Sequence, residues 1–162
     1  KMKYEITKIF RFEAGHRVWK QDLKSGKTAK LSEGVVIENK CVNFHGHSYV
    51  LEVTVGSDTL NEQDVVVDFY HIKSALKDLV DNVFDHSFII DVNDPIYPKF
   101  KELFGCYKIT EVDFCPTAEA LAKYFYDFLV KKLKEANLEE DIKVVSVTLW
   151  ETATGKATYR GE

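Results

Sequence analysis

The sequence predicts an α+β fold in which an antiparallel sheet carries helices on one face. Apolar and polar side chains alternate with a period of two over Tyr4–His16 and again from Phe44 to Gly56, the pattern of half-buried strands. Helical spacing of apolar residues follows Asp68 and Thr117, two residue types that favour a helix N-cap. Grouped strands with inserted helices are typical of this fold class.

The two predicted helices enclose an irregular segment. The first helix runs from its cap at Asp68 to near Phe84, and the second begins at Thr117. Their apolar stripes are Phe69, Ile72, Leu76, Leu79, Val80 and Val83 in the first helix, and Leu121, Tyr124, Phe125, Phe128, Leu129 and Leu133 in the second. Residues 85–116 hold all three prolines, which favours irregular structure with a short helical turn at Phe100–Phe104.

Two further strands are expected at the end of the chain, over Val144–Thr152 and Lys156–Tyr159. The inward face of the first would carry Val145, Val147, Leu149 and Glu151. Residues 17–40 are rich in Lys, Ser, Gly and Glu, which predicts a loop with a short strand at Gly34–Glu38. Because four strands leave two open edges, we expect an oligomer that closes these edges into a barrel.

Composition narrows the classes of function. A chain of 162 residues with 45% hydrophobic content suits one domain over residues 1–162. The net charge of −4 argues against nucleic acid as a partner, because duplex binding needs a basic face. No apolar run is long enough to cross a membrane. The chain has an odd number of cysteines, and their spacing is not that of a disulfide framework. Both features favour reduced thiols and a cytoplasmic location.

Three histidines lie where the two long strands should meet. His45 and His47 are two residues apart on one strand and therefore project from the same face. His16 ends the apolar face of the preceding strand, so antiparallel pairing would bring it to the same corner. A lone histidine is more often a core or loop residue. Three imidazoles with an open fourth position, however, form the usual arrangement of a catalytic zinc, with Zn–N distances of about 2.0–2.1 Å.

Other polar residues have more than one interpretation. Cys41, four residues before His45, could be a nucleophile or base, a fourth zinc ligand, or a small hydrophobe. Asp85 and His86 could relay protons, although a solvated histidine after a helix is the commoner case. Glu151 lies in the inward register of its strand, where a buried carboxylate is costly unless it is paired. Either the strand emerges into solvent there, or Glu151 anchors a ligand that presents adjacent N–H donors.

Six short segments occur in an order that resembles the 6-pyruvoyltetrahydropterin synthase family. They are Phe12–His16, Cys41–Tyr49, Val67–Phe69, Phe84–His86, Pro116–Glu119 and Glu151–Thr152. Within that family, the spacing C-x-x-x-H-G-H resembles the bacterial and archaeal 6-carboxytetrahydropterin synthases, which serve queuosine and other 7-deazapurine synthesis. The pyruvoyl enzymes usually have a longer gap between the Cys and the first His.

The resemblance implies a zinc-dependent lyase that converts 7,8-dihydroneopterin triphosphate to 6-carboxytetrahydropterin, acetaldehyde and triphosphate. The site residues that it implies are Cys41, Asp85 and His86 for catalysis, Glu151, Thr117 and Thr152 for substrate, and His16, His45 and His47 for Zn²⁺. Two alternatives stay open. One is a 6-pyruvoyltetrahydropterin synthase, which eliminates triphosphate, and the other is a non-catalytic structural-zinc or pterin-binding module.

The resemblance also implies the tunnelling fold (T-fold). In that fold each subunit supplies a four-stranded antiparallel sheet with two helices, three subunits close a barrel, and two trimers stack into a homohexamer with sites at subunit interfaces. Residues 17–40 and 91–115 are longer than is usual in the family, and Ala120 replaces the usual Asn after Pro-Thr-x-Glu. We hypothesise that some lysines of the first excursion meet the triphosphate; they are Lys20, Lys24, Lys27 and Lys30.

Overall fold

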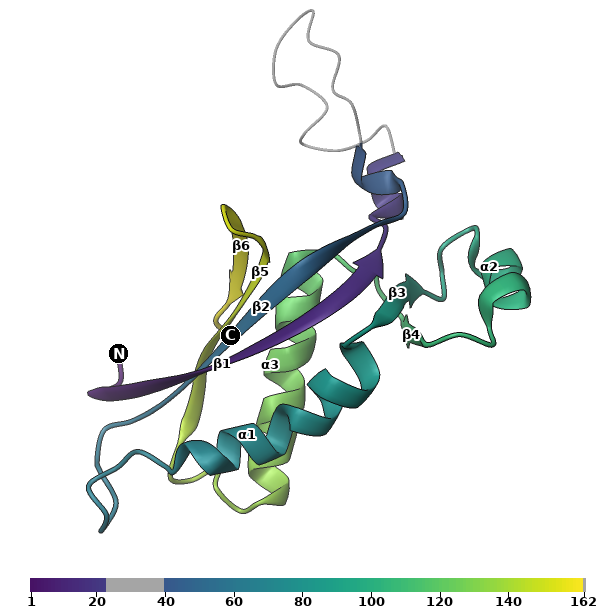
Figure 1. The fold of residues 1–162 in the computed structure, drawn as a ribbon. Helices are drawn as coiled ribbons and strands as arrows, with labels where there is room; N and C mark the ends of the chain where they lie inside the picture. The colour runs from purple at the N-terminus through teal and green to yellow at the C-terminus, as the bar shows by residue number, and fades with distance from the viewer. Residues whose placement is uncertain (23–39, 162) are drawn as a thin grey trace, which may run out of the picture.

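A computed structural model describes residues 1–22 and 40–161 (Figure 1). In these ranges six strands form one mixed sheet in the order β4-β3-β1-β2-β5-β6. The strands are β1 (Tyr4–His16), β2 (His45–Ser57), β3 (Ser87–Asp91), β4 (Ile109–Val112), β5 (Lys143–Thr152) and β6 (Gly155–Tyr159). The helices are α1 (Phe69–Asp78), its π-helical continuation η3 (Leu79–Phe84), α2 (Tyr97–Phe104) and α3 (Ala118–Glu135), with short 3₁₀ turns η1 (Trp19–Asp22) and η2 (Lys40–Val42).

The long antiparallel pair of β1 and β2 is the centre of the sheet. It pairs from Tyr4 opposite Ser57 to His16 opposite His45, so the end of β1 meets the start of β2 as predicted. Apolar side chains alternate with polar ones, and one face of this pair is buried at Phe12, Ala14 and His16 of β1 and at Tyr49, Leu51, Val53 and Val55 of β2. The register therefore sets which residues share the corner at His16.

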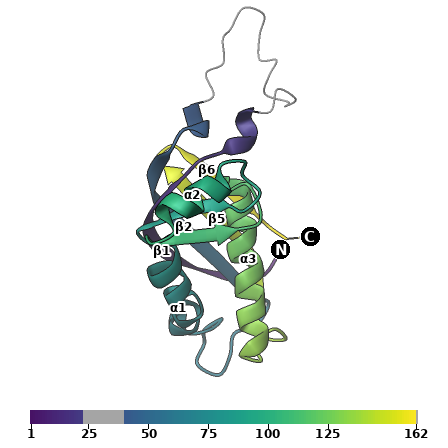
Figure 2. The same ribbon diagram turned by 90° about the vertical axis from the view of Figure 1, so that its right-hand side faces the viewer.

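Both predicted helices cover the buried face of the sheet (Figures 1 and 2). The N-caps are those expected, since Asp68 Oδ1 accepts from the Tyr70 amide at 2.8 Å and Thr117 accepts from the Ala120 amide at 3.1 Å. The ring of Phe12 stacks on Tyr49 with centroids 4.8 Å apart and also packs against rings from η3 and α3. This aromatic core fixes the helices against the central strands.

The predicted four-stranded antiparallel sheet is present as β1, β2, β5 and β6, but it is extended by two short strands. Residues 85–116 were expected to be irregular, and they contain β3 and β4. β3 pairs parallel to β1 through Ala14–Ser87 and Gly15–Phe88, and β4 pairs parallel to β3. Such short strands depend on pairing with distant residues, so no local pattern marks them.

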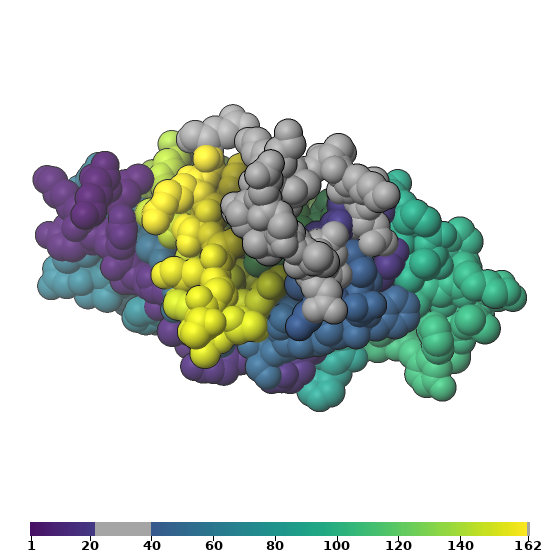
Figure 3. Space-filling view, turned by 90° about the horizontal axis from the view of Figure 1, so that it is seen from above, coloured from purple at the N-terminus to yellow at the C-terminus, as the bar shows by residue number. Residues whose placement is uncertain are grey.

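The chain between β3 and β4 forms an excursion that contains α2. This helix is longer than the predicted turn at Phe100–Phe104, because Pro98 lies in its first turn, where the missing N–H costs nothing. Phe100 packs on Phe88 of β3 with centroids 4.9 Å apart. Seen from above, the teal segment that includes α2 projects from one end of the molecule (Figure 3).

Two further expectations need correction or fall outside the described ranges. Val145 was expected to point inward, but a register shift opposite Thr54 and Val55 buries Val144 instead and leaves Val145 half-buried. The predicted strand at Gly34–Glu38 and three of the four lysines, Lys24, Lys27 and Lys30, lie outside the described residues. Lys20 lies in η1, with its Nζ 5.6 Å from the Trp19 ring.

No helix in residues 1–22 and 40–161 has both the length and the apolar character that a membrane crossing requires.

Candidate active site

Three histidines form a cluster at the corner where β1 ends and β2 begins. One ring nitrogen each from His16, His45 and His47 lies within 4.8 Å of the other two. The His16 side chain is fully buried, whereas the other two are partly exposed. The cluster results from the register, because His16 pairs with His45 and one glycine separates His45 from His47.

Hydrogen bonds determine which nitrogens of the cluster carry lone pairs. His16 Nδ1 donates to the Pro116 carbonyl at 2.7 Å, and His45 Nδ1 donates to the Asn43 carbonyl at 2.7 Å. A carbonyl can only accept, so in the neutral rings both Nε2 atoms bear lone pairs. These two nitrogens nevertheless lie 3.1 Å apart. Two lone pairs at that distance repel each other unless a cation lies between them.

The third imidazole supports the same conclusion. Nε2 of His47 is buried and lacks a hydrogen-bond partner within the described part of the chain. Burial, followed by the nearby His45 charge, also holds the pKa of His47 below its ordinary value. In His16, burial is the main cause that lowers the pKa to about 4. Neutral imidazoles with converging, unused lone pairs are the form that binds a metal ion, and the three histidines could hold one.

Glu151 joins the cluster from β5. Its Oε1 lies 4.0 Å from His16 Nε2, and its Oε2 lies 3.9 Å from His47 Nε2. The inward register predicted for Glu151 therefore brings its carboxylate beside the histidines, with the side chain 28% exposed. Burial and then the negative charge of Glu119 raise the pKa of Glu151, whereas His45 lowers it.

Asp85 and His86 form a hydrogen-bonded pair at the end of η3. Asp85 Oδ2 accepts from His86 Nδ1 at 2.8 Å, and Asp85 Oδ1 accepts from the Glu13 amide at 2.8 Å. The Glu13 amide is the main cause that lowers the pKa of Asp85. His86 has a left-handed backbone (φ 58°) and donates its own amide to the Glu13 carbonyl. Because an ionised Asp85 can only accept, Nδ1 of His86 carries a proton, and in a neutral ring Nε2 would bear the lone pair.

His86 opens mainly on residues of the sheet face opposite the histidine cluster. The His86 side chain is 77% exposed and lines a shallow hollow with Glu13, Gly15, Gly46 and Ser48. These β1 and β2 residues alternate with the clustered histidines and therefore point to the other face. His47 of the cluster also borders this hollow, so within one chain the hollow of His86 reaches one of the three clustered histidines.

A model of the family described as 6-pyruvoyl tetrahydropterin synthase matches residues 5–162. The chain belongs to the 6-pyruvoyl tetrahydropterin synthase family. A protein of Aquifex aeolicus named 6-carboxy-5,6,7,8-tetrahydropterin synthase is 65% identical over 99% of this chain and 100% of its own length. A Rickettsia bellii protein of the same name is 32% identical over 91% of this chain and 94% of its own.

Solved structures of the family and its neighbours have the same fold. An uncharacterized protein from Wolinella succinogenes matches with a TM-score of 0.79 at 28% identity, covering 98% of both chains. The 6-pyruvoyl tetrahydropterin synthase of Caenorhabditis elegans matches with a TM-score of 0.62 at 24% identity, covering 98% of this chain and 96% of that one. At that identity the second match shows the fold alone, and it confirms the predicted T-fold.

The remaining residues implied by the family resemblance lie on segments next to the histidines, Pro116 or Glu151 in the chain. Cys41 is exposed in η2, and its carbonyl accepts from the Val18 amide at 2.8 Å. Thr117 is half-buried and caps α3 directly after Pro116, whose carbonyl orients His16. Thr152 is exposed at the end of β5, where its hydroxyl accepts from the Thr154 amide at 3.3 Å.

Sequence reasoning missed three residues near this family site. Glu119 acts on the pKa of Glu151, and it lies in the Pro-Thr-Ala-Glu segment that was noted only as a motif. Arg17 and Asp94 form an ion pair with an Nε–Oδ2 distance of 2.7 Å, and Asp94 is 3% exposed. Arg17 could have been noticed because it directly follows His16 in the sequence. Its pairing could not, because Asp94 lies 77 residues away and no local pattern connects the two.

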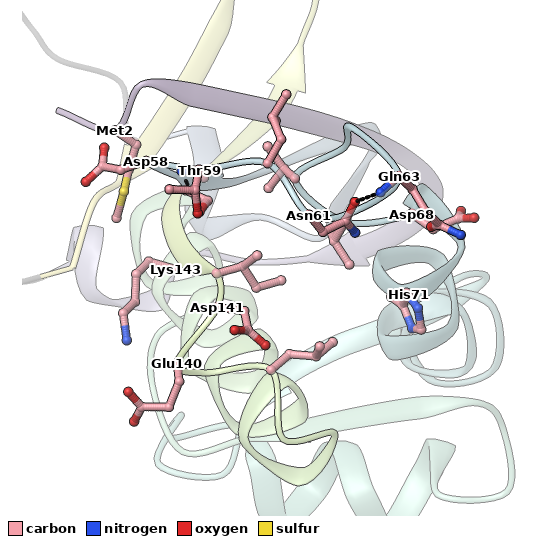
Figure 4. A pocket seen from close by; sticks show the side chains of 17 residues that line it. Met2, Asp58, Thr59, Asn61, Gln63, Asp68, His71, Glu140, Asp141 and Lys143 are labelled. Atoms are coloured by element: carbon pink, nitrogen blue, oxygen red, sulfur yellow. Dashed lines mark hydrogen bonds between the residues drawn. The ribbon is translucent and has the colours of Figure 1, made fainter.

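A different hollow, of about 630 Å³, lies between the β2–α1 connection and the α3–β5 connection (Figure 4). Its lining includes none of the predicted site residues. Acidic groups are prominent there, and two are already used, since Asp58 accepts from the Lys3 amide and Asp68 caps α1. Carboxylates are poor neighbours for a triphosphate, so this hollow does not suit the substrate implied by the family.

Proposed function

We propose that this chain is a zinc-dependent 6-carboxy-5,6,7,8-tetrahydropterin synthase. The reaction converts 7,8-dihydroneopterin triphosphate and water to 6-carboxytetrahydropterin, acetaldehyde and triphosphate. The observation that carries the proposal is the set of three converging imidazoles, two of which face each other with Nε2 lone pairs at 3.1 Å. The Aquifex aeolicus relative of that name, 65% identical over 99% of this chain, supports the choice of reaction.

Zn²⁺ would be held by His16, His45 and His47, whose nitrogen donors and open fourth position suit this ion. When bound, it would supply Lewis acidity that lowers the pKa of substrate side-chain hydroxyls. The carbonyls of Pro116 and Asn43 would fix two of these rings as ligands, since each accepts the Nδ1 proton.

The substrate ring would be held by Glu151, whose two carboxylate oxygens can accept from adjacent N–H donors of a pterin. Its partial burial favours this role, because a ligand that supplies donors offsets the cost of the buried charge. Thr117 and Thr152 lie on the segments that flank this position and are proposed as secondary contacts.

Proton transfer is assigned to Cys41 as general base and to Asp85 with His86 as a relay. Within the described residues of one chain, the hydrogen bonds of His86 go to Asp85 and Glu13 and none reaches the histidine cluster, so we assign its action to the cluster of a neighbouring copy. A homohexamer built as a dimer of trimers would supply that copy. The ionised Asp85 orients His86 and leaves its Nε2 able to take a proton from the substrate or from Cys41.

A 6-pyruvoyl synthase is the second candidate. A Dictyostelium discoideum protein named 6-pyruvoyl tetrahydrobiopterin synthase is 28% identical over 97% of this chain. The two reactions differ in carbon–carbon cleavage, because only the carboxy reaction releases acetaldehyde.

The test is incubation of the zinc-loaded protein with 7,8-dihydroneopterin triphosphate, followed by mass analysis of the pterin and assay of acetaldehyde. We expect 6-carboxytetrahydropterin and acetaldehyde in equal amounts. A pyruvoyl product without acetaldehyde would favour the second candidate. No turnover by a folded, zinc-loaded protein would contradict both.

A further inference from the structure

Arg17, the residue after His16, is held in one orientation by a buried carboxylate. Its Nε donates to Oδ2 of Asp94 at 2.7 Å, and its Nη2 donates to Oδ1 at 2.8 Å. Asp94 is itself fixed at the start of the α2 excursion, since Oδ1 also accepts from the Ile96 amide at 3.0 Å. Two parallel N–H···O bonds fix the plane of the guanidinium, which a lysine ammonium could not do.

The third nitrogen of this guanidinium reaches the turn that carries Cys41. Nη1 of Arg17 donates to the carbonyl of Val42 at 3.1 Å. The neighbouring Val18 amide donates to the carbonyl of Cys41 at 2.8 Å. The chain that leaves β1 therefore binds two consecutive carbonyls of η2.

The histidine cluster binds the next carbonyl of the same turn. Asn43 accepts from Nδ1 of His45 at 2.7 Å, and its own amide donates to the Lys40 carbonyl at 3.1 Å. Three consecutive carbonyls, from Cys41 to Asn43, are thus tied to residues at the ends of β1 and β2. Because the Cys41 side chain is exposed, the place of its thiol depends on the backbone that carries it.

We propose that Arg17, anchored by Asp94, is a positioning residue that holds the Cys41 turn beside the histidine cluster. The inference rests on the proposed function, in which Cys41 is the general base. A general base must lie within hydrogen-bond reach of the proton that it removes, and a misplacement of about 1 Å can cost about 100-fold in rate. Loss of the Arg17 contact should therefore lower kcat and leave KM and metal content unchanged.

The test is the double variant R17M/D94L. A single substitution would leave one charge buried without its partner and could prevent folding, whereas the double variant removes both charges. We expect a folded protein with native zinc content and native KM, and with kcat lowered about 100-fold. Amide hydrogen exchange over residues 40–44 should be about tenfold faster, with unchanged protection over residues 51–55 of β2.

The matched control is K101M/E111L, which removes the ion pair between α2 and β4, with side chains 50% and 35% exposed. It should leave kcat, zinc content and exchange as in the native protein. The inference is overturned if R17M/D94L keeps kcat within about twofold of the native value, whatever its rate of amide hydrogen exchange. It is also overturned if zinc and folded structure are lost together, because Arg17 would then be a general structural residue. If the native protein shows no turnover, the proposed function fails. The inference is then tested by hydrogen exchange alone: unchanged amide exchange over residues 40–44 of R17M/D94L would overturn it.

Discussion

The carboxylate of Glu151 on β5 lies 3.9 Å from Nε2 of His47 on β2, so a third strand contributes to the histidine corner. The oxygen is too distant for a hydrogen bond to that nitrogen. The space between the two groups is where a metal ion and the end of a substrate ring would meet in the proposed reaction.

Glu151→Gln should separate substrate binding from metal binding. We expect KM for 7,8-dihydroneopterin triphosphate to rise by about 10–100-fold, because a hydrogen bond to a charged group contributes about 1.5–3 kcal/mol. Zinc content should not change, since the three imidazoles remain. Steady-state kinetics together with elemental analysis would check this. Loss of zinc with unchanged KM would instead make Glu151 a metal ligand.

Cys41→Ala should abolish proton transfer without loss of metal. Removal of a general base costs about 10²–10⁴-fold in kcat. Cys106→Ala is the matched control, because Cys106 is also a free, exposed thiol and lies on the α2 excursion. Turnover and zinc content should be measured for both variants. Equal activity of the two would exclude Cys41 from catalysis.

Tyr49→Phe should leave the stability of the metal-free protein unchanged or raise it. The Tyr49 side chain is 1% exposed, and its hydroxyl is buried without a hydrogen-bond partner among the described residues. An unsatisfied buried hydroxyl costs about 1–3 kcal/mol, so its removal should raise Tm while the ring still stacks on Phe12. Thermal unfolding followed by circular dichroism would show the change. A fall in Tm would mean that the hydroxyl has a partner.

The metal-free protein should lose stability as pH falls from about 6.5 to 4, because His16 binds a proton more weakly when folded. Burial lowers its pKa to about 4 in the folded state. Within this window the unfolded chain binds a proton that the folded chain does not, so unfolding becomes easier by at most about 3–4 kcal/mol. Above the unfolded pKa the effect is absent.

Urea unfolding of the metal-free protein at several pH values would measure this dependence, with His16→Gln as the control. The variant should show a flatter pH profile. The same decline in both proteins would assign the effect to other groups.

Much of the fold could be predicted because its patterns are local. Alternation over Tyr4–His16 and the caps at Asp68 and Thr117 gave the central strands and the two main helices. The β3 and β4 strands escaped prediction because they are short and exist only through parallel pairing beside β1. The inward face of β5 was wrong at Val145 because a bulge depends on the partner strand, which the sequence of β5 does not contain.

In the candidate site, too, features set by local sequence patterns could be predicted and features set by distant contacts could not. The corner of His16, His45 and His47 was predictable, since strand period and antiparallel pairing together fix it. The direction of the His86 side chain was not predictable, because His86 itself has a left-handed backbone that follows a π-helix. The link between Arg17 and Asp94 was equally hidden, since it joins segments far apart in the chain.

Elemental analysis of the purified protein is the most direct test of the histidine cluster as a metal centre. The account predicts one zinc ion per chain after loading and dialysis, and almost none in His47→Ala, with the variant still folded by circular dichroism. A native protein that binds no metal under any loading condition, or a His47→Ala variant that keeps the full amount, would contradict it.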